Sequence, residues 1–146
     1  MPIWTTHTTP ERLNQRSQGT MVEHIGIEYL EVGADYIKAR MPVDARTRQP
    51  AGILHGGASA VLAETLGSVA GMLCVDRETK AVVGLEINAN HVRPVQEGWV
   101  YGTARPLHLG NSTHIWDIRI TNGDDKLVCI ARLTLAVVHV DKIRKP

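Results

Sequence analysis

The feature that most constrains this chain is an apolar segment that contains a single carboxylate. Residues 55–75 read HGGASAVLAETLGSVAGMLCV, and Glu64 is the one acidic residue among them. The length and composition predict a helix, and a helix that is hydrophobic nearly all round is usually buried. An ionised glutamate in such a helix is costly unless it is paired, hydrogen-bonded or used in chemistry. Glu64 is therefore the residue that a functional interpretation has to explain.

At 100° per residue the predicted helix has two unlike faces. One face carries large residues that we expect to pack against a sheet: Leu62, Leu66, Val69 and Leu73. The opposite face surrounds Glu64 with mostly small residues: Gly57, Ala60, Val61, Gly67, Ser68 and Gly71. Glycine inside a helix costs about 0.5–1 kcal/mol relative to alanine, so we expect another surface or a ligand to approach this face closely. The alternative is a helix kept slim to fit a tight sheet, which accounts for the glycines but not for Glu64.

The rest of the chain predicts an antiparallel sheet that wraps around this helix. A short helix is expected from Pro10 to about Ser17, because Thr9 can cap it and Pro10 suits its first position. Two strands are expected between Met21 and Pro42, and four hairpin-compatible strands follow at residues 81–95, 99–109, 112–121 and 126–140. This order predicts an α+β fold in one domain, residues 1–146, with residues 1–20 as an N-terminal helical extension.

Composition argues against several functional classes. Sixteen Lys and Arg residues stand against fifteen Asp and Glu, which gives no electrostatic argument for nucleic acid or an acidic membrane surface. Cys74 and Cys129 lie in apolar stretches, and no His, Cys and carboxylate cluster has ligand spacing, so we expect reduced thiols and no metal. No signal-peptide pattern is visible, and no apolar run approaches the roughly 20 residues that span a bilayer. A cytoplasmic protein is expected.

The start of the helix is suited to binding a carbonyl oxygen. The first N–H groups of a helix have no internal partner, and at Gly56 a ligand atom can approach the amide without meeting a side chain. Gly56 and Glu64 are eight residues apart, roughly 12 Å along a helix. Two groups acting on one carbonyl must each lie about 3 Å from it. Because two antiparallel helices across a twofold axis can achieve this, we expect an obligate homodimer with two shared sites.

Four stretches carry a family resemblance: residues 41–50 (MPVDARTRQP), 54–59 (LHGGAS), 84–93 (GLEINANHVR) and 106–110 (PLHLG). Over about residues 21–138 the chain resembles hotdog-fold acyl-CoA thioesterases of the branch with a glutamate on the central helix. Within that branch it is similar to bacterial 1,4-dihydroxy-2-naphthoyl-CoA hydrolases and to relatives that clear mis-charged aryl carrier proteins. The resemblance implies a sheet of about six strands around a central helix, no cofactor besides the coenzyme A of the substrate, and a homodimer or dimer of dimers.

The resemblance also implies roles for individual residues. Glu64 would be the nucleophile or the general base that activates water, and the Gly56 amide would polarise the thioester carbonyl. Gln49 and His55 would position the thioester, and Ser68 would orient the carboxylate or the water. The residues implied to hold the coenzyme A arm and its phosphates are Gly84, His91, Val92, Arg93, Pro94, His108, Leu109, Gly110, Asn111, Ser112 and Thr113.

Other functions require features that this sequence lacks. An α/β-hydrolase would need Gly-x-Ser-x-Gly, which the residues around Ser59 do not complete. A hotdog hydratase would pair a catalytic His with an Asp or Glu on the helix, which His55 and Glu64 do not clearly provide. A non-catalytic module that binds acyl-CoA or an acyl carrier protein gives no reason to bury a lone carboxylate.

Only the resemblance predicts the acyl group of the substrate. It favours an aryl-CoA, specifically 1,4-dihydroxy-2-naphthoyl-CoA on the menaquinone route. Benzoyl-type and medium-chain fatty acyl thioesters remain open, as do thioesters on a carrier protein. The walls of the acyl pocket are expected from Val61, Met72, Leu73 and residues of the strands.

Overall fold

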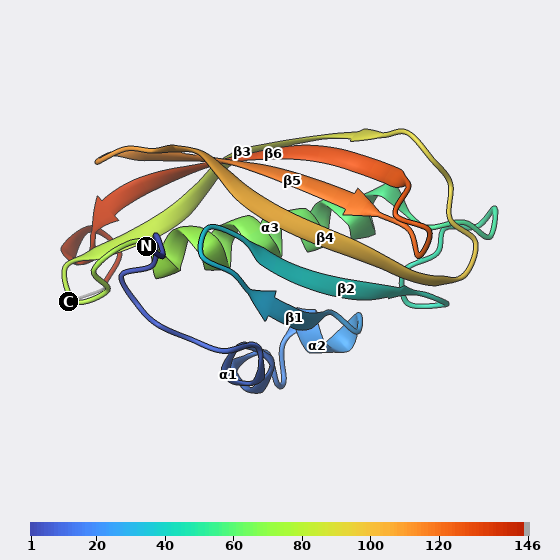
Figure 1. Cartoon of the computed structure of the whole chain (residues 1–146), viewed down its shortest axis with the longest axis horizontal. Helices are drawn as coiled ribbons and strands as arrows, with labels where there is room; N and C mark the ends of the chain where they lie inside the picture. Colours follow the sequence, from blue (N-terminus) through green and yellow to red (C-terminus); the bar gives the residue numbers. More distant parts are fainter. Residues whose placement is uncertain (145–146) are drawn as a thin grey trace.

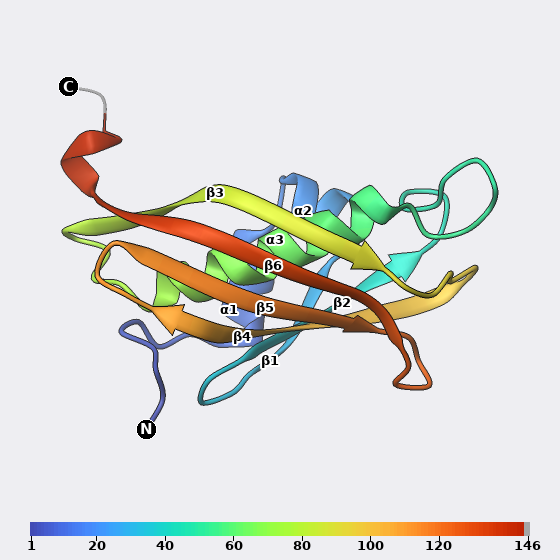
Figure 2. The ribbon, with the colours of Figure 1, turned by 90° about the horizontal axis from the view of Figure 1, so that it is seen from above.

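In the computed structural model, which describes residues 1–144, a six-stranded antiparallel sheet curls around one long helix, α3 (Gly56–Leu73) (Figures 1 and 2). Two shorter helices, α1 (Pro10–Arg16) and α2 (Met21–His24), lie beside the first strand (Figure 1). The expected α+β arrangement is therefore observed. The last two residues of the expected domain, 145 and 146, lie outside the described residues.

The strands lie within a few residues of their expected positions: β1 (Glu28–Val32), β2 (Ile37–Val43), β3 (Lys80–His91), β4 (Gly98–Leu109), β5 (Thr113–Thr121) and β6 (Leu127–His139). Their order in the sheet is β1-β2-β4-β5-β6-β3. The expected run of four consecutive hairpins is wrong at its first step, since β3 pairs with β6 at the edge of the sheet. The link from β3 to β4 is tied instead to the segment before α3, where the Leu54 N–H donates to the Val95 carbonyl at 2.8 Å.

The two strands expected between Met21 and Pro42 are observed as β1 and β2, and residues 21–24 before them form the single turn of α2. So short a segment has too few residues to separate helical from strand periodicity. The expected N-terminal helix is confirmed, with the Thr9 hydroxyl accepting a hydrogen bond from the Arg12 N–H at 3.3 Å. Asn14 fastens α1 to β1, because its side chain accepts from the Tyr29 N–H at 2.8 Å and donates to the Tyr29 carbonyl at 3.1 Å.

The sheet covers more of the α3 surface than the one face of large residues that was expected to pack against it. Leu62, Leu66 and Leu73 are buried as expected, but Val69 is only half-buried on the side away from the sheet. Gly67 and Gly71, expected on the open face, are buried against β6. A Cβ at Gly67 would lie 2.6 Å from Leu133 Cδ2. The two glycines therefore let the curled sheet approach, as the slim-helix alternative proposed.

Glu64 is exposed in the single chain, which corrects the expectation of a buried carboxylate. The reason is that the sheet leaves one face of α3 uncovered. Along that face Gly57 is also exposed, and Val61, Thr65 and Ser68 are half-buried. One side of an otherwise core helix is thus open to solvent or to a partner.

The first turn of α3 is held by the side chain that precedes it. His55 is the N-cap, and its Nδ1 accepts a hydrogen bond from the Gly57 N–H at 2.8 Å. The backbone N–H of His55 donates to the Thr47 carbonyl at 2.8 Å. Because Nδ1 is an acceptor, it carries no proton, and the neutral ring carries its proton on Nε2.

We expect His55→Ala to lower the free energy of unfolding by about 1 kcal/mol, the usual value of an N-cap. His55→Asn should lose less than half of that, because asparagine also accepts a hydrogen bond at this position. Chemical denaturation at one fixed protein concentration measures both. Equal losses for the two variants would show that the Nδ1 contact does not stabilise the helix.

Candidate active site

The residues expected to act on a thioester lie in two separate pockets of the chain. The first, of about 440 Å³ at the start of α3, is lined by Gln49, His55 and Gly56. The second, of about 410 Å³ farther along the open face of α3, is lined by Glu64 and Ser68. The single chain therefore does not bring Gly56 and Glu64 together, in agreement with their roughly 12 Å separation along the helix.

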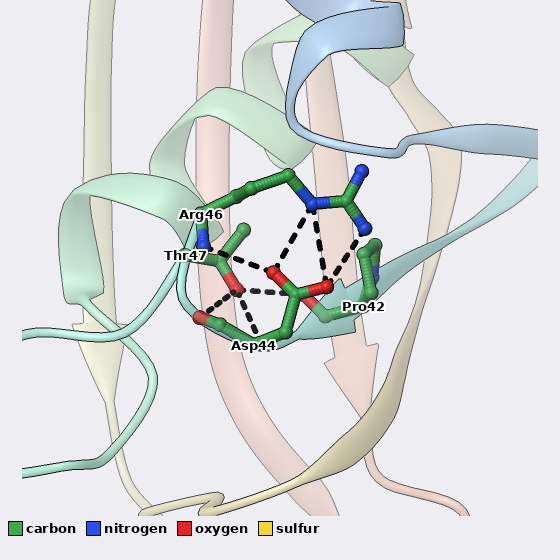
Figure 3. A network of polar contacts seen from close by, with 4 residues as sticks. All are labelled: Pro42, Asp44, Arg46 and Thr47. Carbon is green, nitrogen blue, oxygen red and sulfur yellow. Dashed lines mark hydrogen bonds and ion pairs between the residues drawn. The ribbon is translucent and has the colours of Figure 1, made fainter.

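The loop that carries Gln49 and His55 to the first pocket is fixed by a polar network (Figure 3). The hydroxyl of Thr47, which is 2 % exposed, donates to the Pro42 carbonyl at 2.6 Å and accepts from the Asp44 N–H at 3.2 Å. Arg46 Nη2 lies 2.7 Å from Asp44 Oδ2, and this hydrogen-bonded pairing lowers the pKa of the Asp44 carboxyl. The Thr47 carbonyl accepts from the His55 N–H, so the network is tied to the N-cap residue of α3.

The free amide at the start of α3 is that of Gly56. The Gly57 N–H is occupied by His55 Nδ1, whereas the Gly56 N–H has no hydrogen-bond partner among residues 1–144. Gln49 accepts from the Ala51 N–H through Oε1, which leaves its side-chain NH₂ as a donor. The pocket thus offers an unpaired amide, an imidazole and a carboxamide beside one another.

The first pocket is also lined by His91, the last residue of β3, and by the residues that follow it, Val92, Arg93 and Pro94. A Cβ at Gly56 would lie only 2.7 Å from His91 Nε2, so the imidazole covers the helix start closely. The Arg93 Nε–H donates to the Leu127 carbonyl at 3.2 Å. These four of the expected coenzyme A residues are therefore brought together at the start of α3, and His91 lies against Gly56.

The remaining expected coenzyme A residues lie elsewhere in the chain. Gly84, on β3, is next to Glu64, since a Cβ there would be 3.2 Å from Glu64 Oε1. His108 and Leu109 end β4, Gly110, Asn111 and Ser112 form the turn, and Thr113 begins β5. Leu109, Gly110 and Asn111 line a cavity of about 340 Å³ together with Cys74, at the C-terminal end of α3. One chain thus separates the expected coenzyme A residues into groups at opposite ends of the helix.

The second pocket contains residues that sequence reasoning missed. Its outer wall comes from the N-terminal elements, which contribute Leu13, Arg16, Ser17, Thr20, Val22 and Tyr29. Of the expected wall residues, Met72 lines this pocket, whereas Leu73 is buried at 2 % exposure and lines neither of the two pockets. The Thr9-Pro10 signal predicted α1 itself, but nothing local to it predicted that α1 would dock beside Glu64.

Other features of the described chain bear on the chemistry. Cys74 and Cys129 are not in disulfides, and burial raises the pKa of the Cys74 thiol to about 11, so it is protonated at neutral pH. Among residues 1–144 no group of three or more His, Cys, Asp and Glu side chains could hold a metal ion. None of the helices in that range is long and apolar enough to cross a bilayer.

Comparison with known proteins gives a consistent result. The sequence profile of the Thioesterase superfamily matches residues 51–129. The chain is 52 % identical to the 1,4-dihydroxy-2-naphthoyl-CoA hydrolase of Escherichia coli K12, over 93 % of this chain and 99 % of that protein. It is 53 % identical to the proofreading thioesterase EntH of Cronobacter turicensis, over 93 % of this chain and 98 % of that protein.

A solved structure extends the similarity to the whole fold. The crystal structure of a thioesterase from Haemophilus influenzae superimposes with a TM-score of 0.92 at 50 % identity, over 94 % of this chain and 96 % of that one. The expected architecture, a central helix wrapped by an antiparallel sheet, is confirmed. The chain therefore belongs to the thioesterase superfamily and is a thioester hydrolase with the hotdog fold.

Proposed function

We propose that this thioesterase hydrolyses an aryl-CoA, specifically 1,4-dihydroxy-2-naphthoyl-CoA on the menaquinone route, at sites shared by two subunits. The shared sites rest on the separation of the unpaired Gly56 amide from Glu64, in two pockets along one helix. The substrate rests on the 52 % identity to a 1,4-dihydroxy-2-naphthoyl-CoA hydrolase. Each pocket holds half of the groups that thioester hydrolysis needs. A second copy running antiparallel would bring each half opposite its complement.

In the proposed reaction the thioester carbonyl oxygen accepts a hydrogen bond from the Gly56 amide of one subunit. Glu64 of the other subunit either attacks the carbonyl carbon or takes a proton from a water that attacks it. Negative charge that develops on the oxygen is stabilised by the amide and the helix N-terminus. The carbon–sulfur bond then breaks, and coenzyme A leaves as the thiolate. If Glu64 attacks directly, water hydrolyses the resulting anhydride and restores the carboxylate.

The other site residues have positioning roles in this proposal. Gln49 and His55 orient the thioester, and Ser68, one turn after Glu64, orients the carboxylate or the water. Gly84 leaves space beside Glu64 because it has no side chain. His91, Val92, Arg93 and Pro94 hold the coenzyme A arm, together with the turn at residues 108–113. No metal or organic cofactor takes part, and the cytoplasm is the proposed compartment.

Two surfaces of the chain support a dimer. The open face of α3 exposes Gly57 and Glu64 within a helix that is otherwise part of the core. Strand β3 is at the edge of the sheet, so one side of its backbone has no strand partner among residues 1–144, and Leu85 on it is 63 % exposed. Pairing of β3 with its copy would satisfy that edge and place the two α3 helices side by side. A dimer of dimers is the proposed assembly.

The alternative substrate is an acyl or aryl group on a carrier protein. One relative at 52 % identity is named a naphthoyl-CoA hydrolase and another at 53 % identity is named a proofreading thioesterase, so overall identity does not distinguish the two substrates. A thiol-release assay with aryl-CoA, medium-chain acyl-CoA and aryl carrier-protein thioesters distinguishes them. The proposal expects the highest kcat/KM for the naphthoyl-CoA, and a preference for the carrier-protein thioester would replace it.

We expect Glu64→Gln to lower kcat by about 10²–10⁴-fold, because the amide can neither attack the carbonyl nor accept a proton from water. The affinity for coenzyme A and the melting temperature should change little, since Glu64 is exposed in the single chain. Glu78→Gln is the matched control, because Glu78 is also exposed and lies in the turn after α3. Full activity of Glu64→Gln would remove Glu64 from the mechanism.

Shared sites can be tested by combining two inactive subunits. Gly56→Val should inactivate the site to which its residue 56 contributes, because any Cβ at that position meets His91. A heterodimer of Gly56→Val and Glu64→Gln subunits, purified through two different tags, contains one site with both defects and one with neither. It should therefore recover about half of the wild-type activity. A heterodimer as inactive as the two parent homodimers would contradict sharing.

A further inference from the structure

A small hairpin between β2 and α3 carries Gln49. The Gln49 N–H donates to the Ile53 carbonyl at 2.9 Å, and nearer the base the His55 N–H donates to the Thr47 carbonyl at 2.8 Å. The turn that joins the two sides is closed by the Gly52 N–H, which donates to the Gln49 carbonyl at 2.9 Å. Gly52 has a φ of +83°, a conformation that glycine adopts without steric cost. Gln49 therefore lies at the tip of a hydrogen-bonded unit.

The side chain of Gln49 is oriented by this hairpin. Its Oε1 accepts a hydrogen bond from the Ala51 N–H in the same turn, so the carboxamide is held in one orientation and its NH₂ group remains a donor. Gln49 and Gly56 line the same pocket. The direction of the Gln49 donor relative to the Gly56 amide therefore depends on how the whole hairpin is held against the rest of the chain.

The hairpin needs an anchor, because an isolated two-stranded hairpin is at best marginally stable in water. Its second side is held by the Leu54 N–H, which donates to the Val95 carbonyl at 2.8 Å, and by the helix that follows. On its first side the N–H groups of Thr47 and Arg48 donate to the Asp44 carbonyl at 3.0 and 2.9 Å. Thr47 therefore lies where the first side of the hairpin joins the end of β2.

The Thr47 hydroxyl is the side-chain part of this anchor. Thr47 is 2 % exposed, and its hydroxyl donates to the Pro42 carbonyl at 2.6 Å and accepts from the Asp44 N–H at 3.2 Å (Figure 3). Pro42 belongs to β2 and lies opposite Trp99 of β4, so its carbonyl is fixed in the sheet. Without the hydroxyl both backbone groups would lose a hydrogen bond, and a buried group left unpaired is costly. The hydroxyl thus ties the hairpin to the sheet.

We propose that Thr47 is a positioning residue for thioester hydrolysis, which acts through Gln49 and not on the substrate itself. Gln49 lines the first pocket and Thr47 does not, so an effect of Thr47 on the reaction has to pass through the hairpin. Displacement of an orienting group by about 1 Å can lower a rate by up to about 10²-fold. The inference rests on the proposed function, in which Gln49 orients the thioester.

The test is a double-mutant cycle between Thr47 and Gln49. kcat/KM for benzoyl-CoA and 1,4-dihydroxy-2-naphthoyl-CoA is measured by thiol release with the wild type, Thr47→Val, Gln49→Ala and the double variant. Circular dichroism at the assay temperature shows that each is folded. Thr47→Val keeps the shape of the side chain and removes its hydroxyl, and Thr47→Ala takes its place if the valine variant does not fold.

Thr47→Val should lower kcat/KM about tenfold for both thioesters, since Gln49 acts on the group that the two substrates share. In the Gln49→Ala background the same substitution should change kcat/KM by less than about twofold. Thr47→Ser keeps the hydroxyl and should retain wild-type activity. Thr79→Val is the matched control, because the Thr79 hydroxyl donates to Asp76 in the turn after α3, outside the first pocket.

The coupling between the two residues separates the outcomes. A loss that disappears without Gln49 supports the proposal. An equal loss in both backgrounds would show that Thr47 supports only the fold, and unchanged activity of Thr47→Val would show that it has no role. Both results overturn the inference and leave the proposed function intact. Wild-type activity of Gln49→Ala would remove Gln49 from the proposed function, and the inference would fall with it.

The choice of substrate keeps the inference separate from the proposed aryl-CoA specificity. If the wild type hydrolyses neither aryl thioester, the aryl-CoA proposal fails. The cycle is then run with a medium-chain acyl-CoA, which has the same thioester group, and the same coupling decides for or against Thr47.

Discussion

The close approach of the curled sheet to α3 is the contact on which the rest of the structure depends. Gly67 admits Leu133 of β6, and Gly102 of β4 admits Leu66 of α3, with a Cβ at Gly102 only 2.7 Å from Leu66 Cδ1. Because glycine is used on both the helix and the sheet, strands can pass close to the helix axis. The sheet then closes around one side of α3 and leaves the other side, with Glu64, uncovered.

The sequence predicted the positions of the helices and strands well. It predicted less well which strands lie side by side and how closely the sheet approaches the helix. Periodicity and turn residues located the six strands, and Thr9 and Pro10 located α1. The partner of β3 is β6, a strand far along the chain, and no local pattern encodes that pairing. The positions of Gly67 and Gly71 depend on how far the sheet curls, which is a property of all the strands together.

The site was predicted in the same uneven way. Glu64 and Gly56 were singled out because a lone carboxylate and a glycine-rich helix start are visible locally, whereas Gln49 and His55 were implied only by the family resemblance. The docking of α1 beside Glu64 was missed, since it arises from contacts between residues that are far apart in the sequence, such as Asn14 with Tyr29. The inference that one helix cannot place both halves of the site used only helix geometry, and the two pockets agree with it.

The exposed edge of β3 has a consequence for how the protein is made. A twelve-residue edge strand that exposes Val83 and Leu85 is a template onto which any extended chain can add. In the proposed dimer a second copy covers this edge, and before that pairing a newly synthesised subunit would be prone to aggregation. Pairing between copies would then compete with aggregation for the same backbone groups. The concentration of folded subunits in the cell would set the yield of the protein as well as its activity.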